Sequence, residues 1–401
     1  MHSQTTSASK AATPSLALVA LLAALFATTP LAIDMYLPAM PTMAEGMGAP
    51  IGMVQQSLSI FLVFYALGML ITGPLADSLG RRKLALSGLA GFALASVMLS
   101  QTNSIEVFLF WRAIQAFSGA AATVVVPGII RYLYQEHTAK GMSYVAMTMM
   151  LAPLLAPALG SLVMWFSSWQ MIFVSLALYA AIMLLICWRY LPNINQSKPA
   201  EPAARLQFLH GYKTVLSLKA ARPDIATSMF SSFAFFCFLT AVPLVYIEYF
   251  GVNELWFALL FAFNVLLLML ANLLNSRLVS RTGPERMLKL GVILALSSAS
   301  LLVLFNALHL SLWFTVLTIG PLMASLGLIA TNADAMILMR FPEHTGTATA
   351  VIGTLRFGSG ALAGPLLALT YTGTALPFSV LMWLGVLCIL LSQWHKQKTF
   401  R

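Results

Sequence analysis

The sequence has very few charged residues. Only 8% of its 401 positions are Asp, Glu, Lys or Arg, whereas 60% are hydrophobic. A soluble domain carries charges at roughly 25% of its positions, because its surface must stay in contact with water. The shortage of charge excludes an ordinary soluble protein and indicates that lipid is the main solvent of this chain.

Cysteine is also scarce, and Cys187, Cys237 and Cys388 all fall inside apolar runs. An odd number without paired spacing argues against a disulfide framework or a metal site. The histidines are scattered over loops and span ends without metal-ligand spacing. A nucleotide-binding loop of the type G-x-x-x-x-G-K-[ST] is missing too. These absences argue against an enzyme and against an ATP-driven pump, so we expect no cofactor and an ion gradient as the energy source.

What the sequence has instead is a series of apolar runs about as long as the hydrocarbon core of a bilayer is thick. In lipid every backbone polar group must be paired within the protein, and uninterrupted apolar runs exclude alternating barrel strands. We therefore predict an all-α integral membrane protein with twelve transmembrane helices in two six-helix bundles. The predicted spans are 16–37, 54–75, 84–99, 105–130, 142–166, 169–190, 225–247, 256–274, 288–308, 310–333, 345–369 and 375–394.

The Lys and Arg residues of the predicted loops fall on one side of the predicted membrane. If the N-terminus is cytoplasmic, every loop on the outside lacks Lys and Arg, while Glu45, Glu106 and Glu254 lie there. This is the positive-inside pattern, and it predicts that both termini are cytoplasmic. A basic cytoplasmic face accounts for the formal net charge of +10, so we expect no nucleic-acid partner.

One long polar stretch divides the chain. It predicts a cytoplasmic linker at 191–222 between an N-terminal bundle at 16–190 and a C-terminal bundle at 223–395. Residues 1–15 and 396–401 then form cytoplasmic tails. Two related bundles around a cavity at mid-membrane are what a secondary transporter needs in order to alternate its access.

Two charges lie at similar depth in the first bundle. Asp34 is ~5 Å and Arg112 ~10 Å below the outer surface, at 1.5 Å of helix rise per residue. Charged residues inside a membrane usually face a partner or a wet cavity. We predict that they form a proton- and substrate-coupling pair, in contact directly or through Gln115. The alternatives are that Asp34 caps a helix end at the interface and that Arg112 only braces helix packing or snorkels outward.

Arg356 is a third intramembrane charge, predicted near the middle of the eleventh span. No carboxylate in the C-terminal spans has an obvious matching depth, because Glu248 falls near the outer end of one span and Asp334 near the inner end of another. Its partner is open: an anionic substrate group, water in the cavity, or Asp34 across the two bundles.

The turn after the second span combines a Gly-Pro pair, an acidic residue and a basic cluster. We predict that the Gly-Pro pair breaks the helix and that the turn forms a charge latch between helix ends, although a solvated loop that fixes topology has the same composition. The candidate gating residues are Gly73, Asp77, Gly80, Arg81 and Arg82.

Helix-bending and aromatic residues supply weaker candidates. Pro153, Pro157 and Gly160 permit bending and close helix contact in the fifth span and are candidate hinges. Aromatic residues are candidates for the cavity lining, although packing between helices or against lipid is their commoner role. The candidate lining residues are Tyr36, Tyr65, Phe233 and Phe236.

Five segments resemble a known family. Residues 73–83 (GPLADSLGRRK) are similar to the cytoplasmic signature of the major facilitator superfamily. Residues 111–119 (WRAIQAFSG) and 152–160 (APLLAPALG) resemble motifs of its proton-coupled antiporters. Residues 33–41 (IDMYLPAMP) and 246–251 (YIEYFG) resemble segments of the Bcr/CflA branch of multidrug efflux transporters.

The resemblance implies a monomer of the bacterial inner membrane that exports drug-like molecules, a route to antibiotic resistance, in exchange for protons. Three positions depart from the family pattern: Ser78, Ala116 and Arg356 stand where Arg, Gly and Gln are frequent. These departures bear on the substrate more than on the fold. A narrow-specificity carrier of a nucleoside, sugar or amino acid and a sensor that transports nothing are the alternative functions.

Overall fold

The computed structural model describes residues 16–134, 138–193, 213–341 and 345–399. The side chains of 16, 74, 77, 78, 138–150 and 345–347 lie outside this description. The described elements are α1 (Leu16–Asp34), η1 (Leu37–Ala39), α2 (Met40–Gly46), α3 (Ile51–Leu79), α4 (Arg81–Gln101), α5 (Ile105–Thr123), α6 (Val125–Tyr134), α7 (Thr138–Phe166), α8 (Gln170–Tyr190), α10 (Arg222–Pro243), η3 (Leu244–Tyr249), α11 (Glu254–Thr282), α12 (Pro284–Ala307), α13 (Leu312–Arg340), α14 (Thr345–Gly360), α15 (Ala363–Thr370) and α16 (Leu376–Thr399).

The predicted all-helical membrane fold is confirmed. Among the described residues, eleven helices are long and apolar enough to cross a bilayer, and the shorter apolar helix Leu151–Phe166 completes the series. Large apolar side chains such as Ile293 and Leu317 face outward, with 67% and 64% of their surface exposed, whereas Arg112 and Asn264 are fully buried. This inversion of the soluble pattern follows from a solvent that is itself apolar.

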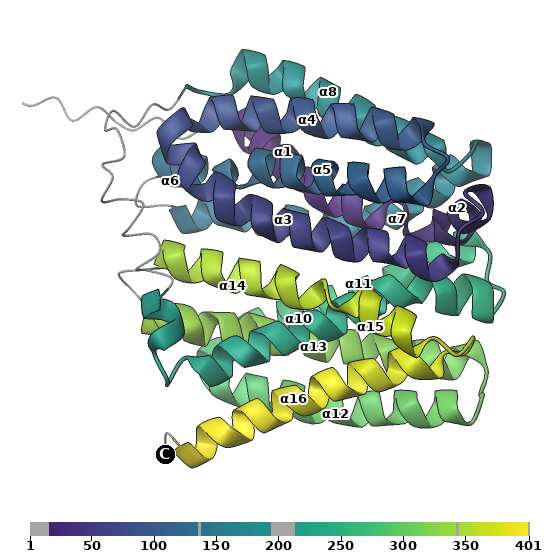
Figure 1. Cartoon of the computed structure of the whole chain (residues 1–401). Coiled ribbons are helices and arrows are strands. Elements are labelled where there is room, and N and C mark those ends of the chain that lie inside the picture. Colours follow the sequence, from purple (N-terminus) through teal and green to yellow (C-terminus); the bar gives the residue numbers. More distant parts are fainter. Residues whose placement is uncertain (1–15, 135–137, 194–212, 342–344, 400–401) are drawn as a thin grey trace, which may run out of the picture.

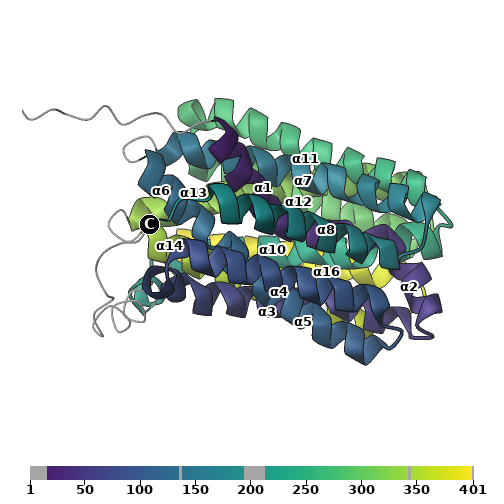
Figure 2. The same ribbon diagram turned by 90° about the horizontal axis from the view of Figure 1, so that it is seen from above.

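The helices form two halves that lie one above the other in Figure 1, with α1–α8 in one half and α10–α16 in the other. Within the halves, α3 and α4 pack on α5, and α12 and α11 pack on α13. Between them, α3 lies along α14 (Figure 1) and α7 lies beside α11 (Figure 2). The seam between the halves therefore runs along these two helix pairs.

The bundle has two distinct ends. We name as the linker end the one at which α8 ends and α10 begins, and as the loop end the opposite one. Close to the loop end, hydrogen bonds join the halves: Gln55 Nε2 to the Thr240 carbonyl at 3.0 Å, Ser161 Oγ to the Glu254 carbonyl at 2.8 Å, and Gly364 N to Ser59 Oγ at 3.0 Å. The two halves are thus fastened together near the loop end.

Helix boundaries differ from the predicted ones in informative places. The predicted break at Gly73 is wrong, because α3 continues through Gly73 and Pro74 to Leu79 and turns only at Gly80, whose φ is +90°. A proline lacks the backbone N–H that would donate a hydrogen bond within the helix. A transmembrane helix tolerates this loss because groups on neighbouring helices can satisfy the freed carbonyl. Conversely, the predicted fourth span is interrupted at Val124, and the predicted eleventh span is divided into α14 and α15.

Candidate functional site

The first helix ends at Asp34, in the middle of an apolar segment. Tyr36 does not continue the helix, and Pro38, which cannot donate a backbone hydrogen bond, follows in η1. The helix end therefore lies inside the protein, and its last carbonyl groups carry partial negative charge. Asp34 and Arg112 both lie at this break in the helix.

Arg112 of α5 is completely buried and sits at this helix end. Its Nη1 donates to the Ala32 carbonyl at 3.3 Å and to Gln115 Oε1 at 2.6 Å. The guanidinium lies 4.3 Å from the centre of the Tyr36 ring and 4.6 Å from that of Phe61. Carbonyl dipoles and aromatic faces thus stabilise the cation in place of a carboxylate.

Asp34 lies two residues beyond Ala32, yet it does not pair with Arg112. Among the described residues, neither Asp34 Oδ1 nor Arg112 Nε and Nη2 has a hydrogen-bond partner, although all three atoms are buried. Gln115, the predicted bridge, donates instead to Ser96 of α4 at 2.8 Å. The two residues therefore lie at the same helix end, but their charged groups are not in contact. Their role in coupling stays a prediction.

Asp34 lines a cavity of about 330 Å³ between the halves. Its walls are mainly apolar and aromatic, and they combine α1 and α7 with helices of the second half. The lining includes Thr29, Pro30, Asp34, Pro153, Ser232, Phe235, Phe236, Phe238, Phe261, Met323, Arg356 and Phe357. An apolar cavity with a few convergent polar groups is typical of a small-molecule site.

The four predicted aromatic lining residues lie in different places. Phe236 lines the cavity, but Phe233 faces Gly385 of α16, because it lies on another side of α10. Tyr36 is fully buried and bonds through its hydroxyl to Ser57 at 3.0 Å. Tyr65 bonds to Thr123 and packs its ring on Phe357 across the seam, with 4.8 Å between ring centres. Neither tyrosine is among the lining residues, since both point into helix contacts.

Arg356 has a partner that the sequence did not reveal. Its Nη1 lies 2.9 Å from Asp334 Oδ2, and its Nε donates to Ser232 Oγ at 2.8 Å. Ser228 Oγ donates to the other oxygen of Asp334 at 2.6 Å. The predicted tenth span ended before Asp334, whereas α13 continues to Arg340 and carries this carboxylate inside the bundle. The long arginine side chain spans the remaining difference in depth.

Arg356 also connects two cavities. A second cavity of about 200 Å³ shares Ser232, Phe235, Leu268 and Arg356 with the first and is also lined by Asp334 and Thr331 of α13. Because Thr331 and Asp334 lie nearer the end of α13 than Met323 does, the second cavity lies closer to the linker end. The central cavity thus continues toward the linker end, past Arg356.

The basic turn between α3 and α4 contacts two other helices of the first half. Arg81 Nη1 donates to the Gly128 carbonyl of α6 at 2.6 Å, and Arg82 donates to the Trp188 carbonyl of α8. The Trp188 carbonyl lies in the last turn of α8, where positive charge is favourable. The side chain of Asp77 lies outside the described residues.

The predicted hinge residues lie in α7, which remains helical through Pro153 and Pro157. Gly160 has a clear packing role: a Cβ atom there would lie 1.8 Å from the Met35 carbonyl oxygen. Only glycine allows α7 to approach the broken end of α1 this closely. Pro153 belongs to the cavity wall.

Comparisons with known proteins agree with this architecture. The family model described as Major Facilitator Superfamily matches residues 17–365. A bicyclomycin resistance protein homolog of Haemophilus influenzae is 31% identical over 364 residues, covering 90% of this chain and 91% of that protein. A chloramphenicol resistance protein of Pseudomonas aeruginosa is 30% identical, covering 82% of this chain and 79% of its own. The crystal structure of the nucleoside transporter NupG aligns with a TM-score of 0.72 at 13% identity, covering 96% of this chain and 98% of that one.

Proposed function

Because this chain belongs to the Major Facilitator Superfamily, we propose that it exports drug-like small molecules across the bacterial inner membrane in exchange for protons. Members of this family are multi-pass membrane transporters, so the chain moves a small-molecule substrate and is not an enzyme. The resistance proteins among its relatives support a drug as the substrate. The proposed orientation has the linker end and both termini in the cytoplasm, as the distribution of basic residues indicates.

One observation carries the proposal: a buried carboxylate without a hydrogen-bond partner on one oxygen lines an apolar cavity between the two halves. A lone intramembrane carboxylate is a typical proton-binding group of transporters. Asp34 can therefore hold a proton when the cavity is empty and lose it when a substrate alters its surroundings. Proton and substrate then compete for one cavity, which is the basis of exchange.

Arg112 takes part in this scheme through the end of α1. Its bond to the Ala32 carbonyl and its contact with Tyr36 fix the backbone on both sides of Asp34. A change in the charge of Asp34 alters the field at this guanidinium, whose Nε and Nη2 have no hydrogen-bond partner among the described residues. The proton state of Asp34 can thereby change how α1 packs on α5.

The halves are proposed to rock as units, 16–190 against 223–395. Hydrogen bonds fasten the halves near the loop end, while the cavities continue toward the linker end. This arrangement supports the proposal that this state receives substrate from the cytoplasm. Pro153, Pro157 and Gly160 of α7 are the proposed hinge, and the basic turn at Arg81 and Arg82 is the proposed gate.

Transport in proteoliposomes with an imposed pH gradient tests the function. Chloramphenicol, a lipophilic cation, a nucleoside and a sugar serve as a panel. We expect proton-linked movement of at least one drug-like member and none in empty vesicles. Proton-linked movement of the metabolites alone would favour a narrow carrier, and a ligand-induced structural change without flux would favour a sensor.

A further inference from the structure

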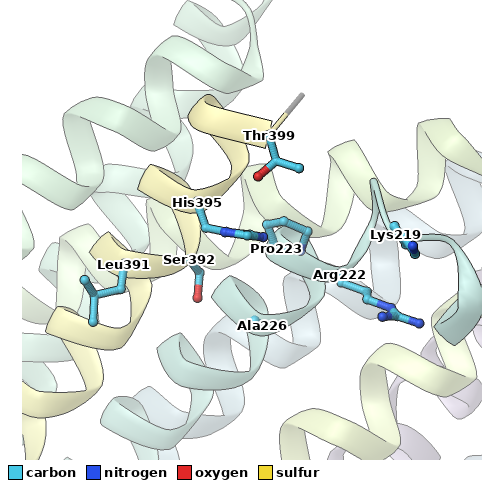
Figure 3. Close-up of a pocket in the computed structure, with 8 residues that line it drawn as sticks. All are labelled: Lys219, Arg222, Pro223, Ala226, Leu391, Ser392, His395 and Thr399. Atoms are coloured by element: carbon cyan, nitrogen blue, oxygen red, sulfur yellow. The ribbon is translucent and has the colours of Figure 1, made fainter. Parts of the chain in front are cut away.

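A groove of about 480 Å³ lies at the linker end of the second half, separate from the transport cavity. It runs between the start of α10 and the end of α16, and it shares no lining residue with the central cavity. In Figure 3, His395 projects from α16 toward Pro223, and Arg222 and Lys219 extend on the other side of Pro223. The lining residues are Lys219, Arg222, Pro223, Ala226, Leu391, Ser392, His395 and Thr399.

The groove has a strong excess of positive charge. Lys219 and Arg222 belong to its wall, and in the described stretches 213–226 and 388–399 the single acidic residue is Asp224. This carboxylate is fully buried and is already neutralised, because Lys396 Nζ lies 2.7 Å and Arg340 Nη2 3.5 Å from its oxygens. The cations of the groove therefore have no acidic partner in these stretches.

The groove also lies at the boundary between lipid and water. Leu391 and Trp394 of α16 are about half exposed on the outer surface of the bundle. The Lys398 ammonium lies 3.9 Å from the centre of the Trp394 ring. Tryptophan and lysine at a span end mark the level of the lipid head groups. Ala226 and Leu391 then lie on the side of the acyl chains, and Thr399 lies on the side of the cytoplasm.

We infer that this groove binds the head group of an anionic phospholipid from the cytoplasmic leaflet. A groove that is basic at its aqueous end and apolar at its membrane end matches a phosphate with an attached acyl chain. Arg222 is suited to hold the phosphate, because its Nε is fixed on the Leu216 carbonyl at 3.1 Å and a guanidinium presents several donors in one plane. The inference is independent of the transported substrate.

Native mass spectrometry of the delipidated full chain tests this inference. Phosphatidylglycerol and phosphatidylcholine are added in turn, and retained lipid is compared between the original protein and Lys219→Gln/Arg222→Gln. Each basic residue near an anionic lipid strengthens binding roughly fivefold, so we expect the double variant to retain about tenfold less phosphatidylglycerol, or less still. Phosphatidylcholine retention stays unchanged.

Matched variants distinguish a specific lipid site in the groove from a general attraction of anionic lipid to basic residues. Arg277→Gln/Arg281→Gln removes the same charge from exposed positions at the linker end of α11 and should keep phosphatidylglycerol binding. Lys219→Arg should keep it too, and thermal unfolding of each variant establishes that it is folded. Equal loss in the α11 variant, no preference for phosphatidylglycerol, or displacement of the lipid by millimolar glycerol phosphate would overturn the inference.

Discussion

Arg112 in the first half and Arg356 in the second are both arginines inside the bundle, but their charges are balanced differently. Arg356 has Asp334 at 2.9 Å and a serine beside it, and 40% of its side chain is exposed. Arg112 is fully buried and contacts aromatic rings and a carbonyl, while Asp34, a carboxylate of the same half, lines the cavity. The charge of Arg356 is therefore balanced by a carboxylate of its own half, whereas the charge near Arg112 is proposed to change when Asp34 gains or loses a proton.

This difference assigns separate roles to the two halves. A group without a fixed partner responds to whatever enters the cavity, so the first half is the proposed site of coupling. An ion pair that is satisfied on both sides orients helices, so Asp334 and Arg356 are proposed to hold α13 against α14 beside the path to the linker end. Each prediction below disturbs one half and uses the other for comparison.

The largest effect is expected for Asp34→Asn. An amide has the shape of the carboxylate but cannot exchange a proton, so drug accumulation against a gradient should fall to the level of empty vesicles while substrate binding persists. Uptake driven by a pH gradient in proteoliposomes measures this. Glu285→Gln, which alters an exposed carboxylate 3.2 Å from Lys289, is the matched control and should transport normally. Full coupled transport by the asparagine variant would refute the role of Asp34.

Arg112→Ala should abolish pH-dependent transport and also lower stability. It removes the hydrogen bonds to Ala32 and Gln115, and bonds from a charged donor contribute roughly 1.5–3 kcal/mol each. Arg112→Lys should rescue little, because an ammonium cannot stack between two rings as a planar guanidinium does. Thermal unfolding in detergent and transport at several pH values measure the two effects. Unchanged pH dependence in the alanine variant would contradict the coupling proposal.

Gly160→Ala tests the close approach of α7 to the broken end of α1. The added Cβ would meet the Met35 carbonyl, so α7 must move, and overpacking of this kind costs roughly 1–3 kcal/mol. We expect lower thermal stability and slower transport. Gly358→Ala in α14 is the control, since nothing lies within 4 Å of its added Cβ. Equal behaviour of the two variants would show that the contact is not important.

Breaking the ion pair of the second half should have a milder effect. Asp334→Asn leaves Arg356 without its counter-ion next to the cavity, and for a partly exposed pair the coupling is about 1 kcal/mol or less. Transport should decline a few-fold and retain its dependence on the pH gradient. The double variant Asp334→Asn/Arg356→Gln should recover part of the transport rate. A double-mutant cycle on the free energy of unfolding gives the coupling energy between the two side chains. Loss of proton dependence in Asp334→Asn would remove the distinction between the halves.

The smallest effect is expected at the loop end. Gln55→Ala removes one hydrogen bond between the halves, worth about 0.5–1.5 kcal/mol, and should shift the population toward opening at that end. Distances between spin labels at Glu106 and Trp313 would report a larger separated fraction. Ser175→Ala, which removes a bond within one helix, should leave the distances unchanged.

Much of the fold could be predicted from the sequence, because hydrophobic runs and loop charge depend on the bilayer rather than on tertiary detail. The site was harder. The position of Arg112 inside an apolar helix was predictable, but the rings of Tyr36 and Phe61 around it depend on how several helices meet. The role of Asp334 as the partner of Arg356 could have been predicted, because a carboxylate beside an apolar run needs a partner as much as Asp34 does. It was missed because the predicted span ended one residue before Asp334.

Substrate-induced proton release from the purified protein in weakly buffered detergent solution tests the central claim most directly. A lipophilic cation is added to the original protein, to Asp34→Asn and to Asp334→Asn, and a pH indicator reports released protons. The account predicts release from the original protein and from Asp334→Asn, and none from Asp34→Asn. Release that persists in Asp34→Asn, or that disappears only in Asp334→Asn, would contradict it.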